Sequence, residues 1–179
     1  MKKSYIIAFW TPVPSLHPQF YLDYFIPFFQ QFGDIQCIDF QSHQDARTMH
    51  LLQQADLVVV GLPVISTYFY SFFCEQRIKF PRVCYAMLDY FPCLEKESLS
   101  LCQQYRIPEH SILHFPYNIQ FLEAVRHGQT QHYLNTSHQL LQNEYKRIFL
   151  QELYLAGLRM LHMIHADVSG CQSLVQYCC

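Results

Sequence analysis

Five short apolar runs, separated by segments with helical spacing, most constrain the fold of this 179-residue chain. Each run has the length of one strand, and the clearest of them is rich in β-branched valine. Runs without polar alternation are typical of strands that are covered on both faces. Strands that alternate with helices favour a parallel sheet with right-handed crossovers. The five runs are Tyr5–Trp10, Ile35–Phe40, Leu57–Leu62, Val83–Leu88 and Ser111–Phe115.

The predicted fold is therefore α/β: a three-layer αβα sandwich around a five-stranded, mostly parallel sheet, Rossmann-like in character. A long C-terminal helix is expected from about Ser137 to His165, because apolar residues recur there at helical spacing. We expect residues 1–170 to form a single domain and residues 171–179 to be a flexible, cysteine-containing tail. The stripe expected to face the core is Leu141, Tyr145, Ile148, Phe149, Leu153, Ala156, Met160 and Ile164.

Composition excludes several classes of protein. Hydrophobic residues make up 51% of the chain, which argues against disorder, and the net charge of −2 disfavours a nucleic-acid partner. No run approaches the ~18 apolar residues of a membrane helix, so no integral membrane segment is expected. The eight cysteines include no C-x-x-C pair, a pattern that suits reduced thiols. A cytoplasmic protein follows as the expectation.

The loop after the first run, Trp10–Pro18, contains three prolines and neither glycine nor lysine. In open α/β sheets the ligand lies outside the carboxyl ends of the strands, and this loop commonly holds phosphate with backbone N–H groups. Proline has no N–H group, so each proline removes a donor. Trp10, Thr11, Ser15 and His17 are expected at this edge, and an apolar plug is favoured over a remodelled ligand site.

Three segments carry a family resemblance. Gln31–Asp39 leads into a strand that ends in an acidic residue, and Leu51–Val60 joins a helix end to the next strand. Phe115–Ala124, followed by Gly128, contains a Pro-Tyr-Asn sequence between a strand and a helix, and Asn118 is expected to cap that helix and Gly128 to end it. These segments resemble the MinD/ParA-type P-loop ATPases. The resemblance implies that Asp39 lies near a magnesium site, and that loss of two βα units leaves a sheet of order 2-1-3-4-5. Without the lysine and hydroxyl of a P-loop, a helix-capping or solvated role is favoured for Asp39.

The chain departs from that family at its central motif, because the proline loop stands where the glycine-rich Walker A loop would hold phosphate. The resemblance therefore implies a reduced, degenerate member with no cofactor, no metal and no recognisable catalytic constellation. A non-enzymatic interaction or scaffold protein is favoured over an enzyme, with an active paralogue or a second copy as its partner. The vestigial site would consist of Trp10, Thr11, Ser15, Asp39, Pro116, Tyr117 and Asn118.

Other functions stay open. The aromatic segment Tyr68–Phe73 somewhat resembles the flavin-facing loop of flavodoxin-like proteins, so a flavin or small-ligand protein is the main alternative. Nucleotide binding without hydrolysis, through residues 116–118, is a weaker one. A metal site on a histidine pair and three cysteines near the C-terminus is disfavoured against a flexible tail. Those residues are His162, His165, Cys171, Cys178 and Cys179.

Overall fold

The computed structural model describes residues 4–14, 19–136 and 144–164. The strands are β1 (Tyr5–Trp10), β2 (Ile35–Asp39), β3 (Leu57–Pro63), β4 (Val83–Tyr90) and β5 (Ile112–Pro116). The α-helices are α1 (Gln19–Gln30), α2 (Ala46–Gln54), α3 (Ser66–Tyr70), α4 (Glu95–Gln104), α5 (Ile119–Arg126), α6 (Thr130–Asn135) and α7 (Glu144–Met163). The π-helical turn η1 (Ser71–Gln76) continues α3, and the 3-10 turns are η2 (Pro92–Leu94) and η3 (Glu109–Ser111).

The five strands form one parallel sheet in the order β2-β1-β3-β4-β5, which confirms the predicted fold class. Phe9 of β1 pairs with Asp39 on one side and with Val59 on the other, so β1 lies inside the sheet. The ladder between β4 and β5 shifts register between Met87 and Tyr90. Such an irregularity locally bends a strand and re-aims its side chains.

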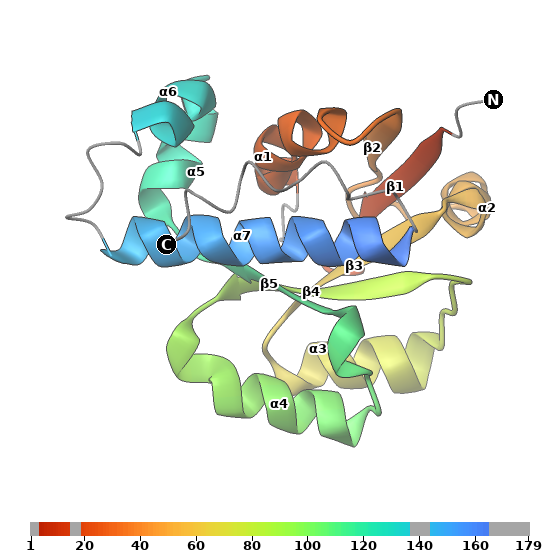
Figure 1. The fold of residues 1–179 in the computed structure, drawn as a ribbon. Coiled ribbons are helices and arrows are strands. Elements are labelled where there is room, and N and C mark those ends of the chain that lie inside the picture. Colours follow the sequence, from red (N-terminus) through yellow and green to blue (C-terminus); the bar gives the residue numbers. More distant parts are fainter. Residues whose placement is uncertain (1–3, 15–18, 137–143, 165–179) are drawn as a thin grey trace.

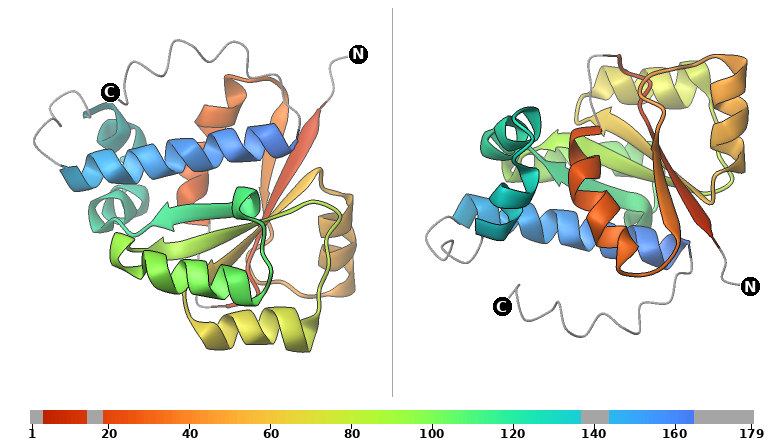
Figure 2. Two further views of the ribbon diagram at one scale, coloured as in Figure 1. Left: turned by 60° about the horizontal axis from the view of Figure 1, so that its bottom comes forward. Right: turned by 90° about the horizontal axis from the view of Figure 1, so that it is seen from above.

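Helices cover both faces of the sheet, as Figure 1 shows, with α1 and α7 on one side and α3 and α4 on the other. The side chains of Ile7 and Phe9 point to one face of β1 and pack with α1, α5 and α7. Ala8 and Trp10 point to the opposite face and pack with α2, α3, η1 and α4. The two views in Figure 2 show the same three layers from other directions. The inner strands β1 and β3 are largely buried on both faces because each face has its own helical layer, whereas the edge strand β2 has exposed positions at Gln36 and Ile38.

The long helix α7 packs along β5 and crosses over α1. Its backbone comes close to α1 at Gly157, where an added Cβ would overlap the ring of Phe28. The predicted stripe is confirmed for the buried residues Phe149, Leu153, Ala156, Met160 and Ile164. Tyr145 is a correction, because its side chain is 86% exposed near the start of the helix. Residues 137–143 and His165, which the prediction included, lie outside the described residues.

Two local expectations need revision. Pro27 is expected to kink or split the first helix, and a split is wrong, because α1 runs as one helix from Gln19 to Gln30 with Pro27 inside it. Ser66 would be expected to cap the next helix, but it is the first residue of α3, and Ile65 takes the capping position without a side-chain hydrogen bond. None of the helices within the described ranges is both long and apolar enough to span a bilayer.

Candidate functional site

The place where a ligand is expected lies between β1 and β3. In doubly wound sheets ligands bind at the carboxyl ends of the strands, at the point where the strand order reverses. Here the chain goes from β1 outward to β2 and returns to β3 on the other side of β1, so the reversal lies between β1 and β3. We call the loops after these two strands the switch point. Its described part is residues 11–14 and 64–65, and Ser15 and His17 lie outside the described residues.

Trp10 ends β1 as a core residue. Its side chain is 0% exposed, and its ring packs against Phe72 and Phe80 with centroid distances of 6.3 Å and 5.8 Å. The indole N–H donates a hydrogen bond of 2.9 Å to the carbonyl oxygen of His43. The one polar atom of the side chain is thus satisfied within the protein, and the ring fills the layer between the sheet and η1. Trp10 therefore faces the core rather than a ligand.

Thr11 closes the gap between β1 and β3. It is 0% exposed, and its hydroxyl donates to the carbonyl oxygen of Gly61 at 2.9 Å. The same hydroxyl oxygen accepts from the backbone N–H of Val13 at 3.1 Å. Its own N–H donates to the carbonyl oxygen of Gln41 at 2.9 Å, which joins this loop to the turn after β2. Thr11 is therefore a buried tie between three strand ends.

The described part of this loop does not fit a phosphate group. Pro12 and Pro14 have no N–H group, and the N–H of Val13 is bonded to the Thr11 hydroxyl. A phosphate cradle needs several backbone N–H groups that point at the ligand. Within residues 11–14 no such donor is left, because the Thr11 N–H is bonded to Gln41. Trp10 and Val13 are both buried, which agrees with the apolar plug expected from the sequence.

Asp39 ends β2 and holds the following turn. Its carboxylate accepts from the backbone N–H of Gln41 at 2.8 Å, where Gln41 has a left-handed φ of 51°. The helix-capping role considered for Asp39 belongs to Asp45, whose carboxylate accepts from the Thr48 N–H at 3.0 Å and from the Thr48 hydroxyl at 2.7 Å. These hydrogen bonds, the hydroxyl first, lower the pKa of Asp45. The hydrogen bond from Gln41 to Asp39 is that of a strand-end turn.

The Pro-Tyr-Asn segment follows β5, at the other end of the sheet. Asn118 caps α5 by accepting from the Phe121 N–H at 2.9 Å, and Gly128 ends that helix with a left-handed φ of 66°. Both features confirm what the sequence predicted for them. Pro116 is buried, and β3 and β4 lie between it and Trp10. The predicted site residues therefore divide between two places, and the structure does not bring them into one cluster.

A second group of residues, of which the sequence analysis identified only Tyr117, lies at the carboxyl ends of β4 and β5. The ring of Phe91 stacks on that of Tyr117 at a centroid distance of 5.3 Å, and both side chains are exposed. The Tyr117 N–H donates to the carbonyl oxygen of Tyr90 at 3.0 Å, which fixes one loop against the other. We call Asp89, Phe91 and Tyr117 the β4–β5 cluster.

Asp89 has an unusual backbone within this cluster. It lies in the register shift of β4 and has a left-handed φ of 52°, a conformation that few non-glycine residues adopt. Partial removal of its carboxyl from water raises the pKa of Asp89. The acid stands directly after an uninterrupted apolar strand, and that position was the signal in the sequence that could have identified it.

Tyr21 of α1 bonds to the end of β5, next to the β4–β5 cluster. It is buried, and its hydroxyl lies 3.2 Å from the carbonyl oxygen of Pro116, to which it donates. Burial first, and then the nearby charge of Asp89, raise the pKa of Tyr21 far above its ordinary range. Tyr21 is therefore a neutral phenol that links α1 to the end of β5.

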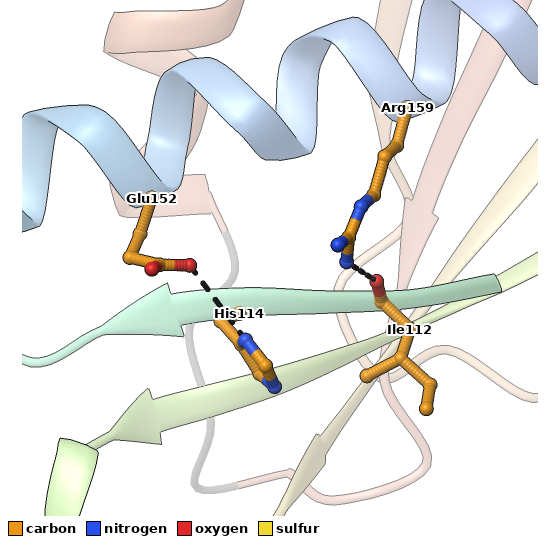
Figure 3. Close-up of polar contacts among 4 residues, drawn as sticks. All are labelled: Ile112, His114, Glu152 and Arg159. Carbon is orange, nitrogen blue, oxygen red and sulfur yellow. Dashed lines mark hydrogen bonds and ion pairs between the residues drawn. The ribbon is translucent and has the colours of Figure 1, made fainter. Parts of the chain in front are cut away.

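Side chains of α7 fasten the outer edge strand, as Figure 3 shows. Arg159 donates a hydrogen bond of 2.7 Å to the carbonyl oxygen of Ile112. Glu152 lies 3.6 Å from Nδ1 of His114, and the His114 ring stacks on Tyr90 at 4.2 Å. Edge strands expose unpaired backbone groups that other chains can bind, so these contacts protect β5.

The remaining residues singled out from the sequence have structural roles or lie outside the described residues. Phe69 and Phe72 of the aromatic segment are buried in the core, whereas Tyr68 and Tyr70 are exposed. In residues 4–14, 19–136 and 144–164 there is no group of three or more His, Cys, Asp or Glu that could hold a metal. The residues considered for a C-terminal metal set, apart from His162, lie beyond those ranges.

Comparison with known proteins gives little for this chain. No protein-family model and no curated protein matches it. Among solved structures, it is similar to the crystal structure of an NADPH-quinone reductase from P. pentosaceus, with 10% sequence identity and a TM-score of 0.30. The match covers 73% of this chain and 97% of that chain. Because the TM-score is this low, the likeness carries no argument about function, and the class rests on the chain's own topology: an α/β protein with a parallel sheet of order 2-1-3-4-5.

Proposed function

We propose that this chain is a non-catalytic protein-interaction domain, a reduced MinD/ParA-like pseudo-ATPase that has lost nucleotide binding. The observation that carries the proposal is the switch point. Trp10 and Thr11 are buried there, and their polar side-chain atoms are bonded within the protein. A site that is filled by its own chain supports loss of nucleotide binding.

Exposed apolar side chains at the same edge of the sheet support an interaction function. They follow β3, β4 and β5, which are adjacent and parallel, so their carboxyl ends lie side by side. Large apolar side chains that gather at one edge of a protein indicate a site for another protein. They are Ile65 at 49% exposure, Tyr68 at 37%, Phe91 at 44%, Tyr117 at 40% and Ile119 at 50%.

The partner that we propose is a protein: an active MinD/ParA-like paralogue or a second copy of this chain. Photo-crosslinking in the native host tests this directly. Tyr117 would be replaced by benzoylphenylalanine, with the same replacement at Leu99, a similarly exposed residue on α4, as the matched control. We expect a discrete adduct from position 117 and none from position 99. Equal labelling at both positions, or none at 117, would contradict the interaction function.

Nucleotide binding is tested separately on the purified chain. Thermal unfolding and equilibrium dialysis with a labelled, non-hydrolysable ATP analogue and Mg²⁺ should show no binding. A ligand that binds only the folded state at 100 times its Kd would add about 2.7 kcal/mol to stability, which such a measurement detects easily. Micromolar binding, or ATP turnover that the Asp39→Ala variant loses, would overturn the pseudo-ATPase proposal.

A flavin or small-ligand protein is the second candidate function. It is favoured by the strand order, in which ligands such as flavins bind at the β1/β3 switch point, and by the exposed Tyr68 after β3. The residues do not fit the phosphate of a flavin mononucleotide at Thr11–Pro14, for the reason given above. Visible absorption of the purified protein and titration with flavin mononucleotide decide between the two. Stoichiometric binding would favour this candidate.

A further inference from the structure

The edge that carries the exposed apolar residues also carries an excess of negative charge. Three segments lie at the carboxyl ends of β3, β4 and β5, namely residues 64–70, 89–97 and 116–122. Their charged residues all lie in the segment 89–97, at the end of β4. These are the carboxylates of Asp89, Glu95 and Glu97 and the ammonium group of Lys96. Burial first, and then the nearby charge of Glu95, raise the pKa of Tyr90. A partner at this place meets aromatic surface beside carboxylates.

The aromatic part of the β4–β5 cluster suits a cation. Phe91 and Tyr117 stack with 30° between their planes, and their exposed fractions of 44% and 40% leave ring surface open to solvent. A guanidinium group is attracted to the electron-rich face of an aromatic ring and stacks flat on it, which an ammonium group does less well. The backbone hydrogen bond from Tyr117 to Tyr90 keeps the pair in place before any partner binds.

Asp89 supplies a charge without an ion-pair partner beside those rings. Neither of the ion pairs formed by the described residues involves Asp89. Asp89 directly precedes Tyr90, whose carbonyl oxygen accepts from the Tyr117 N–H at 3.0 Å, so Asp89 and the aromatic pair lie at the ends of adjacent strands. Its left-handed backbone is the kind of local strain that proteins retain at binding sites. A cation from a partner would provide the counter-charge that the described part of this chain does not.

We infer that the β4–β5 cluster is a docking site for an arginine-bearing segment of the partner protein, with the guanidinium group on the Phe91–Tyr117 rings and paired with Asp89. The inference rests on the proposed interaction function and names the chemistry of the partner at that same surface. It commits to a cationic protein segment, and a neutral apolar segment is the outcome that the experiment can reveal instead.

The test is an NMR titration of the isotope-labelled, full-length chain with N-acetyl-arginine amide at low ionic strength. The matched probes are N-acetyl-lysine amide and N-acetyl-citrulline amide, the latter having the shape of arginine without its charge. Saturable shifts are expected at Asp89, Phe91 and Tyr117 with arginine. We expect weaker shifts with lysine, by about two- to five-fold in affinity, and none with citrulline. Equal shifts with arginine and citrulline, or shifts elsewhere on the surface, would overturn the inference.

Two variants separate this inference from the proposed function. Asp89→Asn keeps the shape of the side chain and should weaken arginine binding by up to about five-fold, while Leu99→Ser should leave it unchanged. The Asp89→Asn change is then combined with the crosslinker at position 117. If the adduct persists and the arginine probe does not bind, the interaction function stands and the arginine chemistry is wrong. If no adduct forms at 117 in the chain that keeps Asp89, while the arginine probe binds that chain, the proposed function fails instead.

Discussion

Two places on the sheet's carboxyl edge, the switch point between β1 and β3 and the β4–β5 cluster, differ in how their polar and aromatic groups are used. At the switch point, Trp10 and Thr11 are fully buried, and their polar atoms are bonded to the backbone. At the β4–β5 cluster, Asp89 has no ion pair with the described residues, and the Phe91 and Tyr117 rings are exposed. The groups at the switch point are bonded and buried within the protein, whereas those at the β4–β5 cluster are open to contact with another molecule.

This difference teaches that position in the fold does not determine function by itself. A doubly wound sheet directs attention to the switch point, but the chemistry that could bind a partner lies beyond β3, at the ends of β4 and β5. Both regions are built from aromatic residues, so composition does not distinguish them. Burial and the partners of the polar atoms do.

The largest effect is expected from Trp10→Ala, which removes the buried indole beside the switch point. Loss of a fully buried aromatic side chain should cost about 3–5 kcal/mol of unfolding free energy, because a cavity remains in the core. Urea denaturation measures the free energy of unfolding. The matched control is Phe91→Ala in the β4–β5 cluster, whose stability should lie within about 0.5 kcal/mol of the wild type. Similar costs for both variants would remove the distinction between the regions.

Thr11→Val should have the next largest effect. The variant keeps the size of the side chain but leaves the Gly61 carbonyl and the Val13 N–H without their partner. Buried groups that lose a hydrogen-bond partner cost about 1–3 kcal/mol. Thermal unfolding checks this against Thr67→Val, an exposed position on α3. A cost at Thr11 no greater than that at Thr67 would mean that the switch point is not tied shut.

Tyr21→Phe tests whether the hydrogen bond from α1 to the end of β5 holds the β4–β5 cluster in place. Loss of the hydroxyl removes the hydrogen bond to the Pro116 carbonyl and should cost about 1 kcal/mol. The ring contacts with Phe115 and Phe121 are retained in the variant. Backbone amide shifts of residues 115–118 should change more than those of β1. If the changes are spread evenly over the sheet, Tyr21 does not act locally on the β4–β5 cluster.

The smallest effect is expected from Asp89→Asn, and it depends on pH. The pKa of Asp89 is raised in the folded state, so the folded chain disfavours its ionised form, and stability is lost as the pH rises through that pKa. Asparagine tolerates the left-handed backbone, so the variant should be more stable at pH 7 by less than about 1 kcal/mol. The gain should vanish below the ordinary aspartate pKa of about 3.9. Unfolding curves from pH 3 to 7 measure it, and a gain that does not change with pH would contradict the assignment.

The sheet could be predicted from the sequence because its inner strands β1, β3 and β4 are nearly uninterrupted apolar runs, and a parallel sheet between two helical layers buries both faces of such strands. Its order came from the family resemblance rather than from a physical rule. Local signals with one dominant cause, such as the Asn118 cap and the Gly128 helix end, were also predicted.

The binding surface could not be predicted in the same way. Burial of Trp10 and Thr11 depends on groups 33 and 50 positions away in the chain, at His43 and Gly61. The left-handed backbone of Asp89 arises from a register shift between two strands, which no local pattern announces. Long-range packing decides both cases, and it decides them in opposite directions.

The protection of β5 by α7 also bears on how the chain is made. β5 precedes α7 in the sequence, so during synthesis β5 leaves the ribosome before α7 can fold over it and place Arg159 and Glu152. For the seconds that the remaining residues take, its outer backbone groups are open to pairing with a neighbouring nascent chain. Docking of α7 on β5 therefore closes a sheet edge that is open during part of the chain's synthesis.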